Sequence, residues 1–274
     1  MTILLTVIFT LLGIAIGSFL NVCIDRLPLR KSLTYPASHC DACQRRLSLK
    51  DMVPMVSYLW LRGRCRYCRA QIPRRVLLLE VLSGVLFFLA FWRFVVSPSP
   101  GYDASYIQFA LTAFWGCVFL VIIFIDWERQ LILNKVTYPA AIVAIVVLGI
   151  DSLLPEPGIL GNLGFIPQPS ILSGVIGGAI GLVFFLIVYI INPRGMGMGD
   201  VKLAGLIGLV TGLPLAIVAL FTGIFLGGLV AVALLLLGRK GRKDVIPYGT
   251  FLGIGPIVAL LWGNDIFNWY LGLF

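Results

Sequence analysis

Long apolar runs separated by short polar connections dominate this chain. A run of about 20 apolar residues can cross a bilayer as a helix, because a helix rises about 1.5 Å per residue and the hydrocarbon layer is about 30 Å thick. Such runs predict membrane helices at 3–22, 76–96, 106–125, 136–154, 171–191, 201–212, 214–237 and 248–263. We therefore predict an all-α integral membrane protein with about eight transmembrane helices.

Two parts of this pattern need separate treatment. The run 3–22 has no basic segment before it and no small-residue cleavage site after it, so we do not expect a signal peptide. The stretch 201–237 is too long for one crossing, and Gly212 and Pro214 predict a break inside it. Its first piece is short, so the sequence leaves open whether 201–212 spans the bilayer or re-enters on the same side.

Composition and charge agree with a membrane protein. Hydrophobic residues make up 59% of the chain and charged residues 12%, against about 45–50% and about 25% in soluble domains. With eight crossings, all 21 Lys and Arg residues except Arg93 fall on one side. The positive-inside rule makes that side cytoplasmic, with both termini outside. The net charge of +9 therefore reflects topology and a lipid environment, and we expect no nucleic-acid partner.

The only sizeable polar segment, 23–75, contains two C-x2-C motifs separated by 21 residues. This spacing is close to that of zinc ribbons, and four thiolates fill a tetrahedral zinc site completely. The alternatives are two disulfides or four unrelated thiols, but disulfides rarely persist in a reducing cytoplasm. His39 is a possible alternate ligand. We predict a small cytoplasmic insert between the first two helices that holds a structural Zn²⁺ through Cys40, Cys43, Cys65 and Cys68.

Elimination narrows the possible chemistry. The chain has one histidine, His39, so a Ser-His-Asp or Cys-His arrangement would have to use that residue. It contains neither H-E-x-x-H nor G-x-x-x-x-G-K-[ST], which excludes a zincin and a P-loop. Carboxylates at the cytoplasmic ends of the predicted helices remain as candidates.

Two of these acids stand out. Asp126 follows an apolar run in "VIIFIDWERQLILN", and Asp200 follows alternating glycines in "NPRGMGMGDVKLAG". The predicted topology places both at the cytoplasmic interface. Two carboxyl groups in a low-dielectric site share one proton, and aspartic proteases use such a pair to activate water. The alternative is that each acid is only an interfacial charge, which costs little away from the bilayer centre.

Four neighbouring residues are candidates for substrate binding or support. Gly197 and Gly199 permit close backbone approach and positive φ, and an extended peptide could pair with this backbone by strand addition. Glu128 follows Asp126 by two residues. Lys202 either lowers the pKa of Asp200 or extends its amine to the lipid headgroups.

Several motifs together resemble one family. "GSFLNVCIDRLP" at 17–28, the paired C-x2-C motifs, "IDWERQLILN", "GMGMGDVKLAGLIGLVTG" and "IPYGTFLGIG" at 246–255 are similar to the signatures of the bifunctional type IV prepilin peptidases. This family, also called leader peptidase/N-methyltransferases, belongs to the GxGD aspartic proteases. The resemblance covers nearly the whole chain and maps the two catalytic aspartates to Asp126 and Asp200.

The resemblance implies a specific activity at the cytoplasmic face of the bacterial inner membrane. The enzyme would remove the basic leader of type IV prepilins, or of type II secretion pseudopilins, after a glycine. It would then methylate the new N-terminus with S-adenosylmethionine. Asn21 and Arg26 are the polar candidates for methyl transfer, although an arginine at the inner end of a span is expected from topology alone.

The implied organisation is a first transmembrane helix at 1–22, the zinc-binding insert at 23–75 and an aspartic peptidase membrane domain at 76–274. One alternative is a peptidase without methyltransferase activity. Another is a non-catalytic zinc-bearing scaffold, or a transporter that uses the two acids for protons. Glu80 carries a smaller alternative, because it could pair with Arg74 or Arg75, or hold the insert against the membrane.

Overall fold

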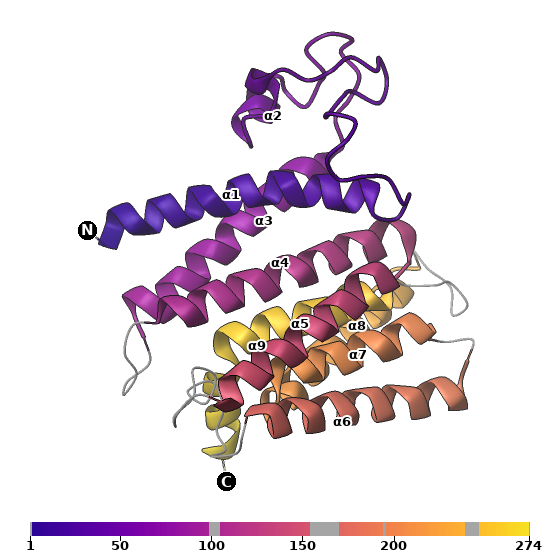
Figure 1. The fold of residues 1–274 in the computed structure, drawn as a ribbon. Coiled ribbons are helices and arrows are strands. Elements are labelled where there is room, and N and C mark those ends of the chain that lie inside the picture. Colours follow the sequence, from indigo (N-terminus) through magenta and orange to yellow (C-terminus); the bar gives the residue numbers. More distant parts are fainter. Residues whose placement is uncertain (1, 99–104, 154–169, 194–195, 239–246, 274) are drawn as a thin grey trace. The chain divides into compact units, whose positions relative to one another are not determined.

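The computed structural model describes residues 2–98, 105–153, 170–193, 196–238 and 247–273, and these are almost entirely helical (Figure 1). The elements are α1 (Thr2–Arg26), η1 (Leu49–Asp51), α2 (Val56–Trp60), α3 (Arg74–Phe91), η2 (Trp92–Val96), α4 (Tyr106–Arg129), α5 (Asn134–Leu153), α6 (Ser170–Ile191), α7 (Met198–Thr211), α8 (Leu215–Leu236) and α9 (Tyr248–Leu271). Within the described residues there is no strand, only two isolated β-bridges in the insert. The all-α prediction is confirmed.

Seven helices in the described part of the chain are long and apolar enough to cross a membrane. They correspond to seven of the eight predicted runs. The remaining run, 201–212, forms α7, which has 14 residues and is therefore only about 21 Å long. The last helix is the main departure, because α9 continues to Leu271, beyond the predicted end at 263.

The chain forms two compact units, residues 1–109 and 110–274. In the first unit, α1 packs against α3 through small residues. A Cβ on Gly13 would lie 2.7 Å from Phe87, and one on Gly17 would lie 2.8 Å from the Cα of Glu80. The hydroxyl of Ser83 donates to the Gly13 carbonyl at 2.7 Å. The predicted division at 22 and 75 remains a prediction, and α1 itself continues to Arg26.

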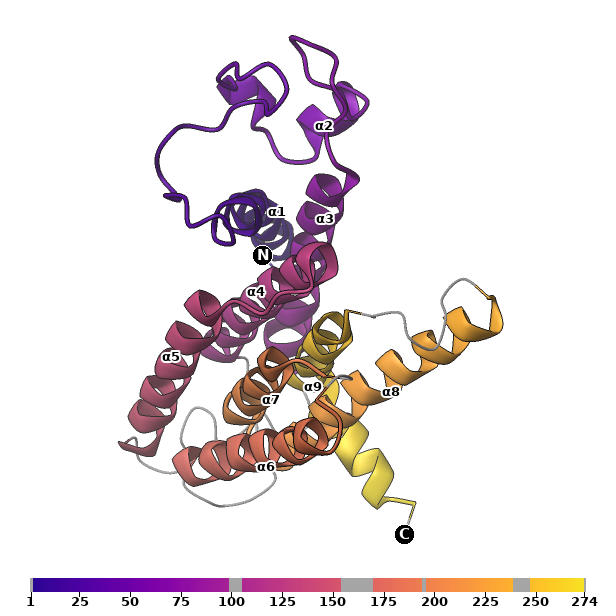
Figure 2. The same cartoon turned by 90° about the vertical axis from the view of Figure 1, so that its right-hand side faces the viewer.

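In the second unit, α7 lies alongside α6, as both views show (Figures 1 and 2). The backbones touch at Gly177 and Gly208, where a Cβ on either glycine would collide with the other residue. After α7 ends, the Leu213 amide donates to the hydroxyl of Ser173, in the first turn of α6, at 2.9 Å. The short helix α7 therefore begins near one end of α6 and its C-terminal turn reaches the other.

The connections 97–105 and 155–170, which the topology places outside, fall mostly outside the described residues. So does the last basic cluster, Arg239, Lys240, Arg242 and Lys243.

Candidate functional site

Three helix ends meet in the second unit: the last turn of α4 and the first turns of α7 and α9. Ile132, just after α4, lies between the two first turns. Its Cδ1 is 2.9 Å from the position of a Cβ on Gly249, and its Cβ is 3.0 Å from that of a Cβ on Gly199. The structure thereby brings Asp126, on α4, to the same place as the first turn of α7, which carries Asp200.

Asp126 is buried, with 4% of its surface exposed. Its Oδ2 accepts the backbone N–H of Thr250 at 2.6 Å and the Thr250 hydroxyl at 3.0 Å. Thr250 is the third residue of α9, whose N-cap is Pro247, a residue with no side-chain acceptor. Asp126 therefore caps α9 from another helix, at the helix end where a negative charge is favoured.

Asp200 is also buried, at 8% exposure, in the first turn of α7. Its Oδ2 accepts the N–H of Gly197, the N-cap residue, at 3.1 Å. Among the described residues, Oδ2 is the acceptor in the hydrogen bonds of both carboxyl groups.

The glycines near Asp200 do not need positive φ. Gly197 has φ −84° and ψ 149°, an extended conformation that any residue can adopt. Positive φ occurs at other described glycines, Gly63, Gly212 and Gly238. Close approach does apply to Gly199, which faces Ile132. Neither Gly197 nor Gly199 uses its freedom to adopt positive φ, and Gly195 lies outside the described residues.

The two charged support candidates behave differently. Glu128 is exposed in the last turn of α4. Lys202 donates to the side-chain oxygen of Asn134 at 3.1 Å and lies 5.3 Å from the centre of the Tyr138 ring. Its ammonium group therefore joins α7 to α5.

The four predicted cysteine ligands lie together in the first unit. Their Sγ atoms are all within 4.8 Å of one another, and those of Cys40 and Cys68 are 3.8 Å apart. Tetrahedral zinc with Zn–S bonds of about 2.3 Å requires sulfur atoms about 3.8 Å apart. All six cysteines are free, so the disulfide alternative is not realised. The donor set fits zinc, while His39 directs its Nδ1 to the Ala37 carbonyl.

Backbone amides support this cluster. N–H groups of Cys68 and Tyr67 point at the Cys65 sulfur and lower the pKa of the Cys65 thiol to about 7. A thiol must lose its proton before it can bind a metal, so these two amides favour the ligating form of Cys65.

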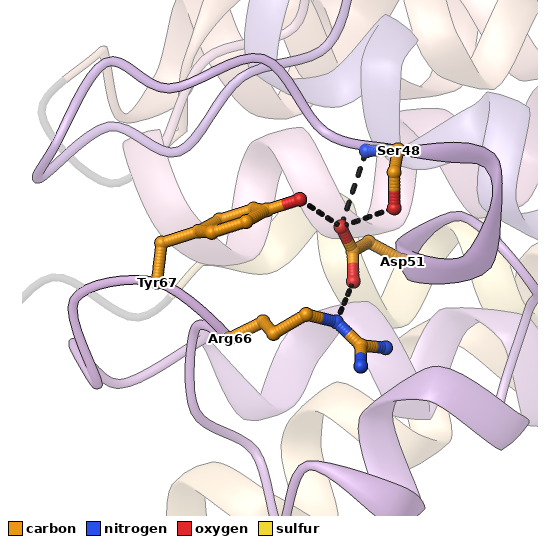
Figure 3. Close-up of polar contacts among 4 residues, drawn as sticks. All are labelled: Ser48, Asp51, Arg66 and Tyr67. Atoms are coloured by element: carbon orange, nitrogen blue, oxygen red, sulfur yellow. Dashed lines mark hydrogen bonds and ion pairs between the residues drawn. The ribbon is translucent and has the colours of Figure 1, made fainter.

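Asp51 joins the parts of the insert (Figure 3). Its carboxylate accepts bonds from the Arg66 Nε at 2.6 Å, the Ser48 hydroxyl at 2.7 Å and the Tyr67 hydroxyl at 3.1 Å. Burial opposes ionisation, but these bonds lower the pKa of Asp51 to about 2. Arg45 lies 4.3 Å from the centre of the Tyr67 ring. Asp51 was not singled out from the sequence, although "SLKD" is a recognisable capping pattern.

The two methyltransferase candidates have different surroundings. Asn21 is buried at 6% exposure, and its Nδ2 donates to the carbonyls of Gly17 and Val76. Its Oδ1 is buried without a partner among the described residues. Arg26 donates instead to three carbonyls of the loop that follows α1, those of Ser32, Leu33 and Pro36.

Comparison with protein families gives two matches. Residues 11–94 match the bacterial peptidase A24 N-terminal domain, and residues 113–232 match the type IV leader peptidase family. The second range contains both acids of the helix-end site. The membrane helices and the two family matches thus define a multi-pass membrane peptidase.

Curated relatives match over nearly the whole chain. Proteins from Aeromonas hydrophila and Pseudomonas putida are each 30% identical, over 95% and 94% of this chain and 92% and 91% of their own length. A Bacillus subtilis protein is 28% identical over 98% of both chains. Each is named a prepilin leader peptidase/N-methyltransferase. The chain belongs to the type IV leader peptidase family. No solved structure matches it.

Proposed function

We propose that this chain cleaves the basic leader of type IV prepilins or pseudopilins, with Asp126 and Asp200 as the catalytic pair. The observation that carries this proposal is the meeting of two buried carboxyl groups at converging helix ends. The names of the relatives supply the substrate class.

The chemistry follows from two carboxyl groups that hold one proton between them. The ionised group takes a proton from a water molecule as the water oxygen attacks the peptide carbonyl. The protonated group donates to the carbonyl oxygen. Collapse of the tetrahedral intermediate breaks the C–N bond, and a proton passes to the leaving amine. We assign this water and this carbonyl to the Oδ1 atoms, because the hydrogen bonds of both acids to the described residues use Oδ2.

The backbone of Gly197 is already engaged by Asp200, which limits its part in pairing with a substrate strand. Its N–H donates to the Asp200 carboxylate and its carbonyl accepts from the Asp200 amide. An extended peptide that pairs with this segment would therefore use neighbouring groups, such as those of Met196. The exposed, side-chain-free Gly197 leaves the approach to Asp200 open.

Asp126→Asn and Asp200→Asn test the aspartate mechanism. Each substitution keeps the side-chain shape and removes the acid, so cleavage of a purified prepilin should be abolished while zinc content stays normal. Asp41→Asn is the control, because Asp41 is an exposed carboxylate in the insert. Processing by both variants would rule out the mechanism and favour a scaffold. Uptake of protons or solutes by the wild-type protein without cleavage would favour a transporter.

Methyl transfer from S-adenosylmethionine is the second proposed activity, and the names of the relatives support it. Asn21 fits a ligand-binding role, because its buried Oδ1 could accept a hydrogen bond from a ligand amine. Arg26 is already engaged by the loop after α1, which favours a structural role. Asn21→Ala should lower transfer of labelled methyl groups and leave cleavage unchanged. Cleavage by the wild type without any labelled product would mean a peptidase alone.

The proposed location is the bacterial inner membrane, with the zinc insert in the cytoplasm and both termini outside. The sorting of Lys and Arg residues along the sequence supports this orientation. It places both acids on the side where newly made prepilins expose their leaders.

A further inference from the structure

The insert carries an exposed apolar surface that neither the zinc cluster nor the acid pair explains. It extends from η1 through α2, a five-residue helix. We call it the α2 patch, and its members are large apolar side chains that are all exposed: Leu49, Met52, Val53, Val56, Leu59 and Trp60. Trp60 is 81% exposed. Exposed apolar clusters of this kind mark interaction surfaces.

A buried hydrogen bond fixes the start of α2 to the membrane helices of the same unit. The N–H of Met55, the N-cap residue of α2, donates to Glu80 Oε2 at 2.7 Å. Glu80 is buried in the second turn of α3 and also bonds Ser18 of α1. Glu80 thus holds the insert against the helices, which was one of the two roles that the sequence left open.

The Met55–Glu80 bond determines where the α2 patch lies relative to the ends of α1 and α3. Arg75 and Asp25 form an ion pair at 2.6 Å, which brings the basic end of α3 to that of α1. Helical side chains lean toward the helix N-terminus, so the Glu80 carboxylate points back toward that end. The beginning of α2 therefore lies at the rim of two helices that are embedded in lipid, where tryptophan and apolar side chains accumulate.

The segment that follows the patch is basic. Residues 61–75, which connect α2 to the first turn of α3, contain six arginines and no acid. Four of them are exposed and precede α3: Arg62, Arg64, Arg66 and Arg69. Arg66 is paired with Asp51, so Arg62, Arg64 and Arg69 are the ones that can meet headgroups. An apolar face flanked by arginines is the pattern of segments that lie in the headgroup region of anionic membranes.

We propose that the α2 patch lies in the lipid headgroup region beside α1 and α3, and that the arginines after it bind anionic headgroups. The insert is then held to the membrane at both ends of its chain and also at its middle. The metal cluster would sit against the bilayer surface at a fixed height. This inference does not depend on the peptidase proposal.

The emission of Trp60 tests the contact directly. The full chain and Trp60→Phe are placed in nanodiscs of phosphatidylcholine and phosphatidylglycerol, with or without bromine on the acyl chains. The chain has six tryptophans, so the difference between the two proteins isolates Trp60. We expect brominated lipid to remove most of this emission and aqueous iodide to have little effect. Omission of phosphatidylglycerol should weaken the quenching by brominated lipid.

A second pair of variants keeps the proposal falsifiable. Tyr35 is 79% exposed and lies outside the patch, so Tyr35→Asp is matched to Trp60→Asp. Trp60→Asp should speed amide hydrogen exchange across residues 49–62 in nanodiscs, and Tyr35→Asp should not, with normal zinc content in both. Unchanged exchange in Trp60→Asp would overturn the proposal. So would iodide quenching of Trp60 that ceases only when a prepilin is added, because the patch would then bind protein.

Discussion

The two proposed catalytic acids are held by unequal sets of hydrogen bonds. Among the described residues, Asp200 accepts one bond, from the N-cap of its own helix. Asp126 accepts two bonds, both from Thr250 on a different helix. The orientation of Asp126 therefore depends on the position of α9, whereas that of Asp200 is set within a single turn of α7.

Replacement of Thr250 tests this dependence. Thr250→Ala removes the hydroxyl bond to Asp126 and keeps the backbone bond. A hydrogen bond to a charged group contributes about 1.5–3 kcal/mol, so kcat should fall by roughly tenfold or more if the bond orients the reacting group. KM should change little, because Thr250 is buried. Thr250→Ser, which keeps the hydroxyl, should restore most of kcat; equal losses in both variants would assign Thr250 a packing role.

Two glycines near the acids should respond differently to a methyl group. A Cβ on Gly249 would lie 3.0 Å from the Asp126 Cγ, whereas one on Gly197 would lie no closer than 3.5 Å to the Asp200 Oδ2. Displacement of a reacting group by about 1 Å can cost roughly 100-fold in rate. Gly249→Ala should therefore abolish most cleavage, and Gly197→Ala should stay within a few-fold of wild type. Comparable rates for the two variants would contradict this assignment.

At the scale of elements, the packing of α6 on α7 positions the first turn of α7. Gly208→Ala would drive a methyl group into the Gly177 backbone, whereas a Cβ on Gly228 of α8 meets nothing within 4 Å. Overpacking of this kind costs about 1–3 kcal/mol. Gly208→Ala should lower the thermal unfolding temperature in detergent and Gly228→Ala should not. Retained stability in Gly208→Ala would mean that the two helices can separate at no cost.

The insert is a second element whose order depends on one side chain. Asp51→Asn removes the charge that Arg66 and Tyr67 bind, next to the cysteine pair Cys65 and Cys68. The loss of charge-assisted bonds of about 1.5–3 kcal/mol should speed zinc release to a chelator by roughly tenfold or more. Asp41→Asn, in the other cysteine turn, should release zinc at the wild-type rate. Release at the same rate from all three proteins would exclude this role for Asp51.

Apolar periodicity predicted where the helices lie, because the length of a membrane helix is set by the bilayer. It failed at the end of α9, where Gly263, Asn264 and Asp265 lower the hydropathy but continue the helix. A helix needs only backbone hydrogen bonds and packing, and both persist beyond the apolar run. The doubled C-x2-C spacing likewise predicted the cysteine cluster, since ligand geometry restricts spacing directly.

The hydrogen-bond partners of the two acids could not be predicted from the sequence. Thr250 lies 124 residues from Asp126, and nothing in the local pattern of either segment indicates that a carboxylate will cap a distant helix. The motif "IPYGTFLGIG" contains Thr250, but the motif alone does not distinguish a hydrogen-bonding threonine from a packing one. The Met55–Glu80 bond escaped prediction for the same reason.

At the scale of the whole molecule, the number of crossings decides where the C-terminus lies. Seven crossings would place the two termini on opposite sides, and eight would place them on the same side. The short helix α7 does not reach the length of a standard span, but the turn after it bonds Ser173 in the first turn of α6. We infer that α7 counts as a crossing, because its start and its end lie at opposite ends of α6.

The side of the membrane on which each terminus lies then follows from the unit that contains it. In the second unit, α9 begins at the acid site and ends at Leu271, away from it. In the first unit, α1 begins at Thr2 and ends at the basic rim formed by Arg26 and the Asp25–Arg75 ion pair. With the basic side cytoplasmic, both termini should lie outside. Alkaline phosphatase fused after Phe274 should be active, and a green fluorescent protein fused at the same place should not fluoresce. The reverse result would make α7 a re-entrant segment and place the C-terminus in the cytoplasm.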